Sequence, residues 1–239
     1  MTPLSPSLVT EIGTVKLIQL GAVKREDSTG RSWRYSLAGG TTLGRGKLAV
    51  AATVDAQRIN LSFATAPAAG DKDVSVTIGT GAATANDYQD GWMVVQDGTG
   101  EGRAYQIEGH GAITASTAGT FKLKDPIDTA GALAETNVDL IKNFYSGLVI
   151  SVTDQDDLNA GVPNVAITNA YYGWVQTYGP CAVWMDEAVT NGNMVSAGTS
   201  VAGSLEQYDY DSGEAIVGVI AGTAGVDAEY QLVDLSIKY

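Results

Sequence analysis

Several kinds of residue are scarce in this chain of 239 residues, and each scarcity excludes a class of function. It has one cysteine and one histidine. A single cysteine cannot form an internal disulfide framework or a zinc site built from several cysteines. A single histidine cannot supply a metal centre built on histidines. No metal or other cofactor is therefore expected.

Charge and long apolar runs are also scarce. Charged residues make up 17% of the chain, below the roughly 25% typical of soluble domains. The longest charge-free apolar candidate, residues 215–226, has three glycines and is too short to span a bilayer. The first residues lack the basic start and apolar core of a signal peptide. We therefore expect a protein without a membrane partner that is made in a cytoplasm.

The charge that is present is mostly negative. The formal net charge is −13, so a nucleic-acid backbone would be repelled and nucleic acid is not an expected partner. Half of the 14 basic residues nevertheless lie near the N-terminus: Lys16, Lys24, Arg25, Arg31, Arg34, Arg45 and Lys47. This uneven distribution indicates either a solvated arm or an arm that docks on an acidic protein surface.

Hydrophobic periodicity predicts an all-β protein with little helix. In "DVSVTIG", Val74, Val76 and Ile78 alternate with polar residues, as in a half-buried strand. "GWMVVQDGTGEGRAYQIEGH" predicts a hairpin with a glycine-rich turn over 97–102, and Phe121 begins another alternating strand. We expect antiparallel β-sandwich or β-barrel domains over 51–145 and 146–239, after an extended N-terminal arm over 1–50.

The glycine-rich stretches do not form nucleotide-binding motifs. "GGTTLGRGK" lacks the spacing of a phosphate loop and has Leu48 where a Ser or Thr is required. Nucleophilic catalysis would need a base beside Cys181, and His110 falls in the other predicted domain. Two acidic clusters, Asp154 with Asp156 and Asp157, and Asp209 with Asp211 and Glu214, do not follow a calcium-loop pattern. We therefore predict that the protein is not an enzyme.

The most unusual segment is "AYYGWVQTYGPCAVWMD", over 170–186, which combines the cysteine with five aromatic residues. Strand alternation predicts that Tyr172, Trp174 and Tyr178 share one face, and that a turn at Gly179-Pro180 brings Trp184 back toward them. Such a cluster would fill a core or an oligomer interface, or would form a platform that stacks on sugar rings. Cys181 is expected to be a small buried residue.

The chain resembles structural proteins from the head genes of tailed bacteriophages. The resemblance lies in the hairpin stretch quoted above, "FKLKDPI", "YYGWVQTYGPCAV", an "EYQLVDLSI"-like end and the opening "GAVKREDSTGRSWRYSLAGGTTLGRGKLA". It implies a β-rich capsid decoration protein, also called a cement or minor head protein. Such a protein lies on the outer capsid surface of the virion, binds the major capsid protein and is often a homotrimer.

We also expect the basic N-terminal arm to be the element that anchors the protein to the capsid. Its candidate anchoring residues are Arg25, Arg31, Trp33, Arg34 and Tyr35. The alternative function is a head-fibre or tail protein that binds host-surface glycans through Tyr172, Trp174, Tyr178 and Trp184.

Overall fold

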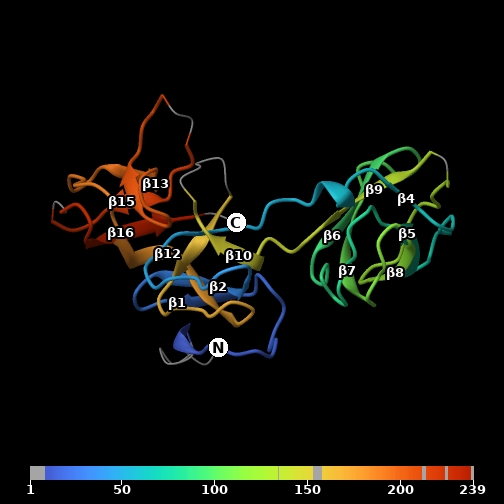
Figure 1. The fold of residues 1–239 in the computed structure, drawn as a ribbon, viewed down its shortest axis with the longest axis horizontal. Helices are drawn as coiled ribbons and strands as arrows, with labels where there is room; N and C mark the ends of the chain where they lie inside the picture. The colour runs from blue at the N-terminus through green and yellow to red at the C-terminus, as the bar shows by residue number, and fades with distance from the viewer. Residues whose placement is uncertain (1–8, 134, 153–157, 212–213, 224–225, 238–239) are drawn as a thin grey trace. The chain divides into compact units, whose positions relative to one another are not determined.

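The structure is a computed structural model that describes residues 9–133, 135–152, 158–211, 214–223 and 226–237. Its elements are strands with a short 3₁₀ helix at Ala56–Arg58, so the predicted all-β fold is confirmed (Figure 1). The chain divides into two units. Unit 1 combines Met1–Ala52 with Phe144–Tyr239, and unit 2 is Thr53–Asn143.

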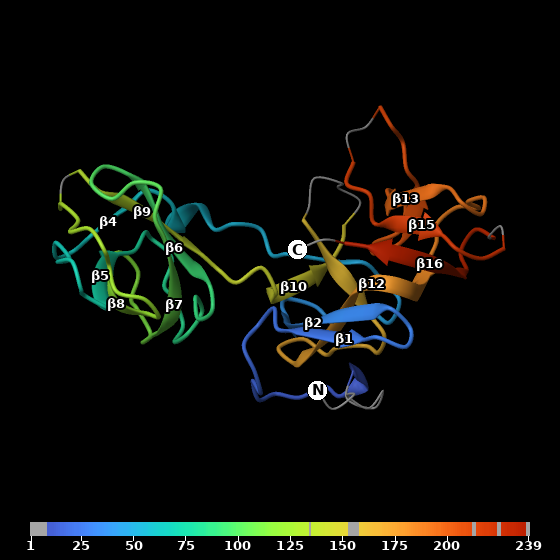
Figure 2. The same ribbon diagram turned by 180° about the vertical axis from the view of Figure 1, so that it is seen from behind.

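Unit 1 contains a ten-stranded sheet in which a single long strand, β12, pairs with three others. Its strand order is β1-β2-β10-β3-β11-β12-β16-β15-β13-β14, with a further pairing between β2 and β12. Figure 2 shows β1, β2 and β12 within this unit. The strands are β1 (Val23–Glu26), β2 (Arg31–Ala38), β3 (Ala49–Val50), β10 (Ser146–Ile150), β11 (Asn159–Pro163), β12 (Tyr172–Trp184), β13 (Met194–Ala197), β14 (Leu205–Gln207), β15 (Gly218–Ile220) and β16 (Tyr230–Ser236).

The segment predicted as an extended N-terminal arm is different in the structure. It supplies β1, β2 and β3 to the sheet of unit 1, together with strands from the C-terminal half of the chain. Trp33 and Tyr35, in β2, are 2% and 4% exposed. Burial of two large aromatic side chains stabilises this pairing by several kcal/mol, at about 1.5–3 kcal/mol for each large apolar side chain. The segment packs against strands that are far away in the sequence, such as β12, so the local sequence pattern could not predict this pairing.

The predicted turn at Gly179-Pro180 is also absent from the structure. β12 runs unbroken through both residues, and Gly179 and Pro180 pair with Leu235 and Asp234 of β16. Gly179 has φ of 81°, a left-handed conformation that glycine adopts without steric cost. The Gly-Pro step therefore marks an irregular position within a strand, and its sequence signal was misread as a chain reversal.

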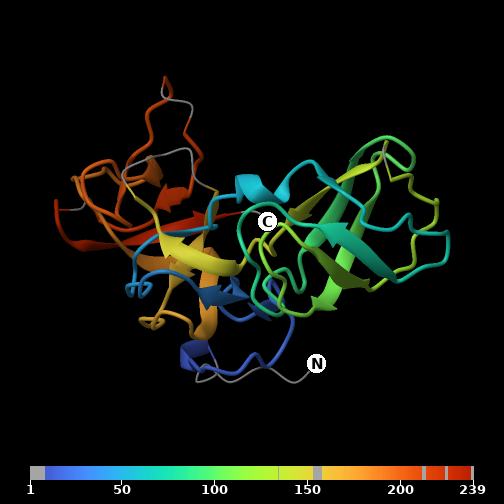
Figure 3. The same ribbon diagram turned by 45° about the vertical axis from the view of Figure 1, so that its right-hand side comes forward.

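Unit 2 is built on a six-stranded sheet in the order β4-β9-β6-β7-β8-β5. The bridge between Phe63 and Val76 joins its two ends, which makes the sheet nearly barrel-shaped (Figure 3). The strands are β4 (Leu61–Ser62), β5 (Asp73–Thr77), β6 (Trp92–Asp97), β7 (Ala104–His110), β8 (Ala118–Leu123) and β9 (Asn137–Ile141).

The core of unit 2 follows the alternation read from the sequence. Val74, Val76 and Ile78 are buried, as are Phe121 and Leu123. The β6–β7 hairpin occurs where the glycine-rich turn predicted it. These elements could be predicted because each strand has one apolar and one polar face and each turn is short.

Candidate functional site

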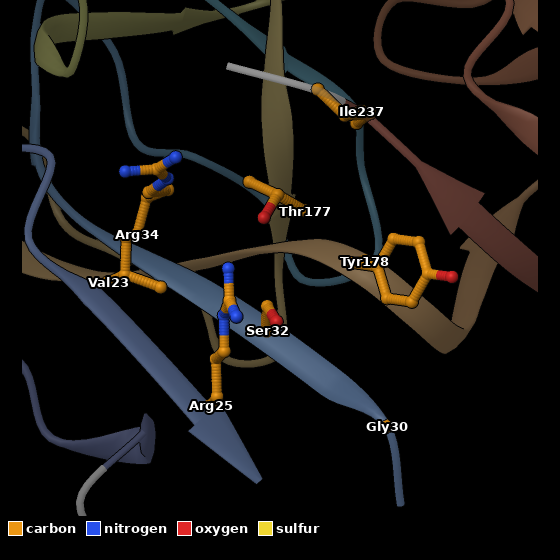
Figure 4. A pocket seen from close by; sticks show the side chains of 8 residues that line it. All are labelled: Val23, Arg25, Gly30, Ser32, Arg34, Thr177, Tyr178 and Ile237. Carbon is orange, nitrogen blue, oxygen red and sulfur yellow. The ribbon is translucent and has the colours of Figure 1, made fainter. Parts of the chain in front are cut away.

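A surface groove of about 710 Å³ lies on unit 1, where β1, β2 and β12 meet (Figure 4). It is lined by residues from both segments of the unit: Val23, Arg25, Gly30, Ser32, Arg34, Thr177, Tyr178 and Ile237. Two guanidinium groups, two hydroxyls and one phenol ring are thus gathered in one concave surface. Among these described lining residues none is acidic, so the groove is locally basic on a protein of net charge −13.

The pairing of β1 with β2 explains why the two arginines face the same way. Val23 is opposite Arg34, and Arg25 is opposite Ser32. Because side chains alternate between the faces of a strand, these four residues share one face. Figure 4 shows the side chains of Arg25 and Arg34 on the same side of the two strands.

The opposite face of the same two strands is buried. Lys24 is paired with Trp33, and the side chains of both, like that of Tyr35, are almost inaccessible. The two faces of the hairpin therefore differ. The face that carries Trp33, Tyr35 and Lys24 packs into unit 1, and the face that carries Arg25 and Arg34 borders the groove. Burial of Trp33 and Tyr35 holds Arg25 and Arg34 at the surface.

The two arginines of the groove differ in how they are held. The Arg34 guanidinium donates a hydrogen bond to the carbonyl oxygen of Gly21 over 2.9 Å and lies 5.8 Å from the ring centroid of Tyr145. For Arg25, the described part of the chain supplies no hydrogen bond or ion pair. The Arg34 guanidinium is thus held in position at the groove by Gly21 and Tyr145, whereas the Arg25 guanidinium is held by no such contact from the described residues.

The third arginine of the predicted anchoring set, Arg31, has a local role. It forms an ion pair with Glu26 over 2.7 Å and lies 5.0 Å from the ring centroid of Trp33. Hydrogen bonds from Thr29 and from Arg31 lower the pKa of the Glu26 carboxyl. Arg31 therefore closes the turn between β1 and β2, and the predicted set divides into two groove residues, one turn residue and two buried aromatics.

The residues of the predicted aromatic platform are also divided between different places. Tyr172 and Trp174 belong to a packed aromatic cluster. The rings of Tyr172 and Tyr35 stack with centroids 5.8 Å apart, and Trp174 meets Tyr35 edge-on at 5.3 Å. Lys24 places its Nζ 5.5 Å from the Trp174 ring centroid. Burial is the main cause of the lowered pKa of Lys24. Ring faces that a sugar would need are thus already in contact with protein groups.

Tyr178 and Trp184 lie apart from that cluster. The register of β12 against β2 shifts between Gln176 and Tyr178, so Tyr178 is opposite Ser32 and lines the groove, with half of its surface exposed. Trp184 packs against Tyr230 with ring centroids 5.0 Å apart, and Lys47 Nζ lies 4.7 Å from the Trp184 ring centroid. The expectation that Trp184 folds back toward Tyr172 is therefore wrong. A β-bulge and an unbroken strand separate these side chains.

The single cysteine and the single histidine are both buried, Cys181 in unit 1 and His110 in unit 2. Cys181 is 6% exposed, and burial raises the pKa of its thiol to about 12, so the nucleophilic thiolate is strongly disfavoured. His110 belongs to unit 2, and its Nε2 accepts a hydrogen bond from the Tyr88 backbone N–H over 3.0 Å. Burial is the main cause of the lowered pKa of His110. Each residue is therefore occupied by packing in its own unit.

The acidic clusters do not assemble a metal site in the described part of the chain. Asp154, Asp156 and Asp157 lie outside the described residues. In the second cluster Asp209 accepts a hydrogen bond from the backbone N–H of Asp211, and Glu214 instead accepts one from the Ser196 hydroxyl.

Sequence reasoning missed the five groove residues Val23, Gly30, Ser32, Thr177 and Ile237, none of which carries a charge. One signal was present, since alternation within "RSWRYSLA" places Ser32 and Arg34 opposite to Trp33 and Tyr35. Thr177 and Ile237 carried no local signal, because their place depends on the pairing of distant strands.

The described residues define an all-β protein with an arginine-lined groove at the surface of unit 1. Comparison with protein-family models, curated proteins and solved structures found no match to this chain. Within the described ranges, no helix has both the length and the apolar character needed to cross a bilayer.

Proposed function

We propose that this chain is a structural protein of a tailed-bacteriophage virion that binds the major capsid protein on the outer capsid surface and stabilises the shell. The observation that carries the proposal is the groove between β1, β2 and β12. It is formed largely by the N-terminal segment that we expect to anchor the protein, and it presents Arg25 and Arg34 to a partner.

The roles of Cys181 and His110 support a protein that works by binding rather than by catalysis. A thiol with a pKa of about 12 is a poor nucleophile, and Nε2 of His110 is already used as an acceptor. A binding function needs a rigid surface, and the pairing of β12 with β2, β11 and β16 provides one. We propose that the protein is not an enzyme.

Deletion of the gene from the phage tests the proposal. Particles without the protein should lose DNA at a lower temperature and survive osmotic shock less well than wild-type particles, and added purified protein should restore both properties. Electron cryomicroscopy of particles with the labelled protein should place it on the outer shell. Unchanged stability together with label on the tail would overturn the proposal.

A homotrimer is part of the same proposal and can be tested separately. Light scattering of the purified protein and of the protein released from virions should give the mass of three chains. A monomer in both samples would contradict the homotrimer. Capsid binding would then be tested by the deletion experiment alone.

The alternative, a head-fibre or tail protein that binds glycans, has less support from side-chain packing. Trp174 and Trp184 each have a lysine over the ring, while Tyr178 is half exposed. A glycan array separates the two proposals. Binding that is lost in Tyr178→Ala, but retained in the control Tyr210→Ala at an exposed tyrosine outside the groove, would favour the alternative.

A further inference from the structure

The free edge of β1 borders the groove. Among the described strands β1 pairs only with β2 and stands at the end of the ten-stranded order. The N–H of Tyr35 donates to the carbonyl oxygen of Ala22 over 3.0 Å, so hydrogen-bonded positions continue at Lys24 and Glu26. The backbone groups of Val23 and Arg25 therefore point away from β2, where another extended chain can accept and donate hydrogen bonds.

The spacing of the two arginines matches the repeat of such an added strand. Arg25 is opposite Ser32, so Arg34 is its diagonal neighbour, at roughly 7–8 Å between the backbone positions. Alternate side chains on one face of a strand are about 6.5–7 Å apart. Carboxylates two positions apart on an added strand would therefore lie opposite Arg25 and Val23, and the second would be level with Arg34, which extends from β2 behind Val23.

The charge of the groove selects the chemistry of the occupant. Arginine binds carboxylates through paired N–H groups, and Ser32 and Thr177 add hydroxyl donors beside them. A nucleic-acid backbone would meet the repulsion of a chain with net charge −13. A short acidic segment can enter the basic groove and leave most of the acidic surface at a distance.

We propose that the groove binds an extended acidic segment of a partner protein, which adds to the edge of β1 and places alternate carboxylates on Arg25 and Arg34. This inference rests on the proposed function in one respect: it makes the major capsid protein the carrier of that segment. The side chains between the carboxylates point to the other face of the added strand. On the groove face, the exposed side chains of Val23 and Tyr178 flank the two arginines.

Peptide binding to the purified full-length chain tests the groove directly. The probe is a fluorescein-labelled peptide of alternating glutamate and valine, and its binding is measured by fluorescence anisotropy. The comparison peptides replace glutamate with lysine, or place prolines at the positions whose N–H groups would face β1. The glutamate peptide should bind at least about tenfold more tightly than either one, and more weakly as salt is added. Equal binding of the glutamate and lysine peptides would overturn the proposal.

Charge-reversal variants locate the binding. Arg25→Glu and Arg34→Glu should each weaken peptide affinity about tenfold or more. Arg45→Glu is the matched control, because Arg45 is exposed and does not line the groove. Arg25→Lys keeps the charge and should recover part of the affinity. Thermal unfolding monitored by circular dichroism checks that all variants fold, and undiminished binding by well-folded Arg25→Glu would refute the assignment.

Two further measurements separate this proposal from neighbouring ones. Groove-dependent binding of a polyuronate, with no binding of the glutamate peptide, would overturn the proposal and show that the groove binds an anionic glycan. Co-sedimentation with capsids that lack the protein tests the proposed function itself. Capsid binding that survives Arg25→Glu and Arg34→Glu would leave the function in place and overturn the groove as its site. Groove-dependent peptide binding without capsid binding would support the groove as a peptide site and overturn the proposed capsid function.

Discussion

The backbone N–H of Tyr88 donates a hydrogen bond to Nε2 of His110 over 3.0 Å, while Nδ1 of His110 lies 2.7 Å from the carbonyl oxygen of Gly111. An acceptor at Nε2 and a donor at Nδ1 define the neutral ring with its proton on Nδ1. The ring also packs against Phe121, with centroids 4.8 Å apart. The single histidine is therefore held uncharged in the core of unit 2.

This arrangement makes the stability of unit 2 depend on pH. The pKa of His110 is lowered from its ordinary value of 6.5, mainly by burial. Between the two pKa values the unfolded chain holds more protons, so stability falls as pH drops below 6.5, with a slope of at most about 1.4 kcal/mol per pH unit. His110→Gln keeps an acceptor near the position of Nε2 and cannot titrate. Calorimetry of the full chain at about pH 7 and about pH 5 should show a smaller loss for the variant. An equal loss in both proteins would show that other groups cause it.

Arg58 should be among the most sensitive positions of unit 2. Its side chain is 2% exposed and donates to the carbonyl oxygens of Gln57, Gly81 and Ala82 over 2.7–3.1 Å. Arg58→Ala leaves these acceptors without their charged donor and should cost about 3 kcal/mol or more in the free energy of unfolding. Arg103→Ala is the control, because the Arg103–Asp128 ion pair is exposed on both sides and its loss should have little effect. Urea unfolding of the two variants measures the difference, and similar midpoints would contradict it.

The thiol of Cys181 should be unreactive in the folded protein. It packs with Val183, Val233 and Leu235 in a core cluster, and its pKa of about 12 leaves almost no thiolate near neutral pH. A thiol-reactive dye should label the chain rapidly only after it is unfolded in denaturant. Cys181→Ser buries a hydroxyl and should cost about 1–3 kcal/mol in stability. It should leave peptide and capsid binding unchanged. Rapid labelling of the folded chain would contradict the buried packing role.

The turn between β6 and β7 requires glycine for a steric reason at one position in particular. Gly98 has φ of 77°, and a Cβ there would overlap the carbonyl oxygen of Glu135. Gly98→Ala should therefore destabilise the protein by more than about 2 kcal/mol. Gly102 has φ of 80° with open space around it, so Gly102→Ala should cost only the backbone strain of about 1–2 kcal/mol. Thermal unfolding that ranks Gly102→Ala as the more harmful change would refute this account.

The sequence predicted those parts of the fold that depend on near neighbours. Val74, Val76 and Ile78 alternate with polar residues, and such a pattern is stable only as a strand with one buried face. The glycines after Asp97 allow the positive φ angles of a tight hairpin. The presence of only one cysteine and one histidine was by itself enough to exclude disulfide frameworks and histidine metal centres.

Tertiary structure alone decided where β1, β2 and the groove lie. Ser32 and Tyr178 are opposite one another although 145 intervening residues separate them in the chain, and the register shift after Gln176 moves Tyr178 away from Tyr172 and Trp174. Strand alternation specifies which residues share a face, but it does not specify which distant strand provides the neighbour. That choice follows from the burial of Trp33 and Tyr35, a non-local gain in free energy that leaves Arg25 and Arg34 at the surface.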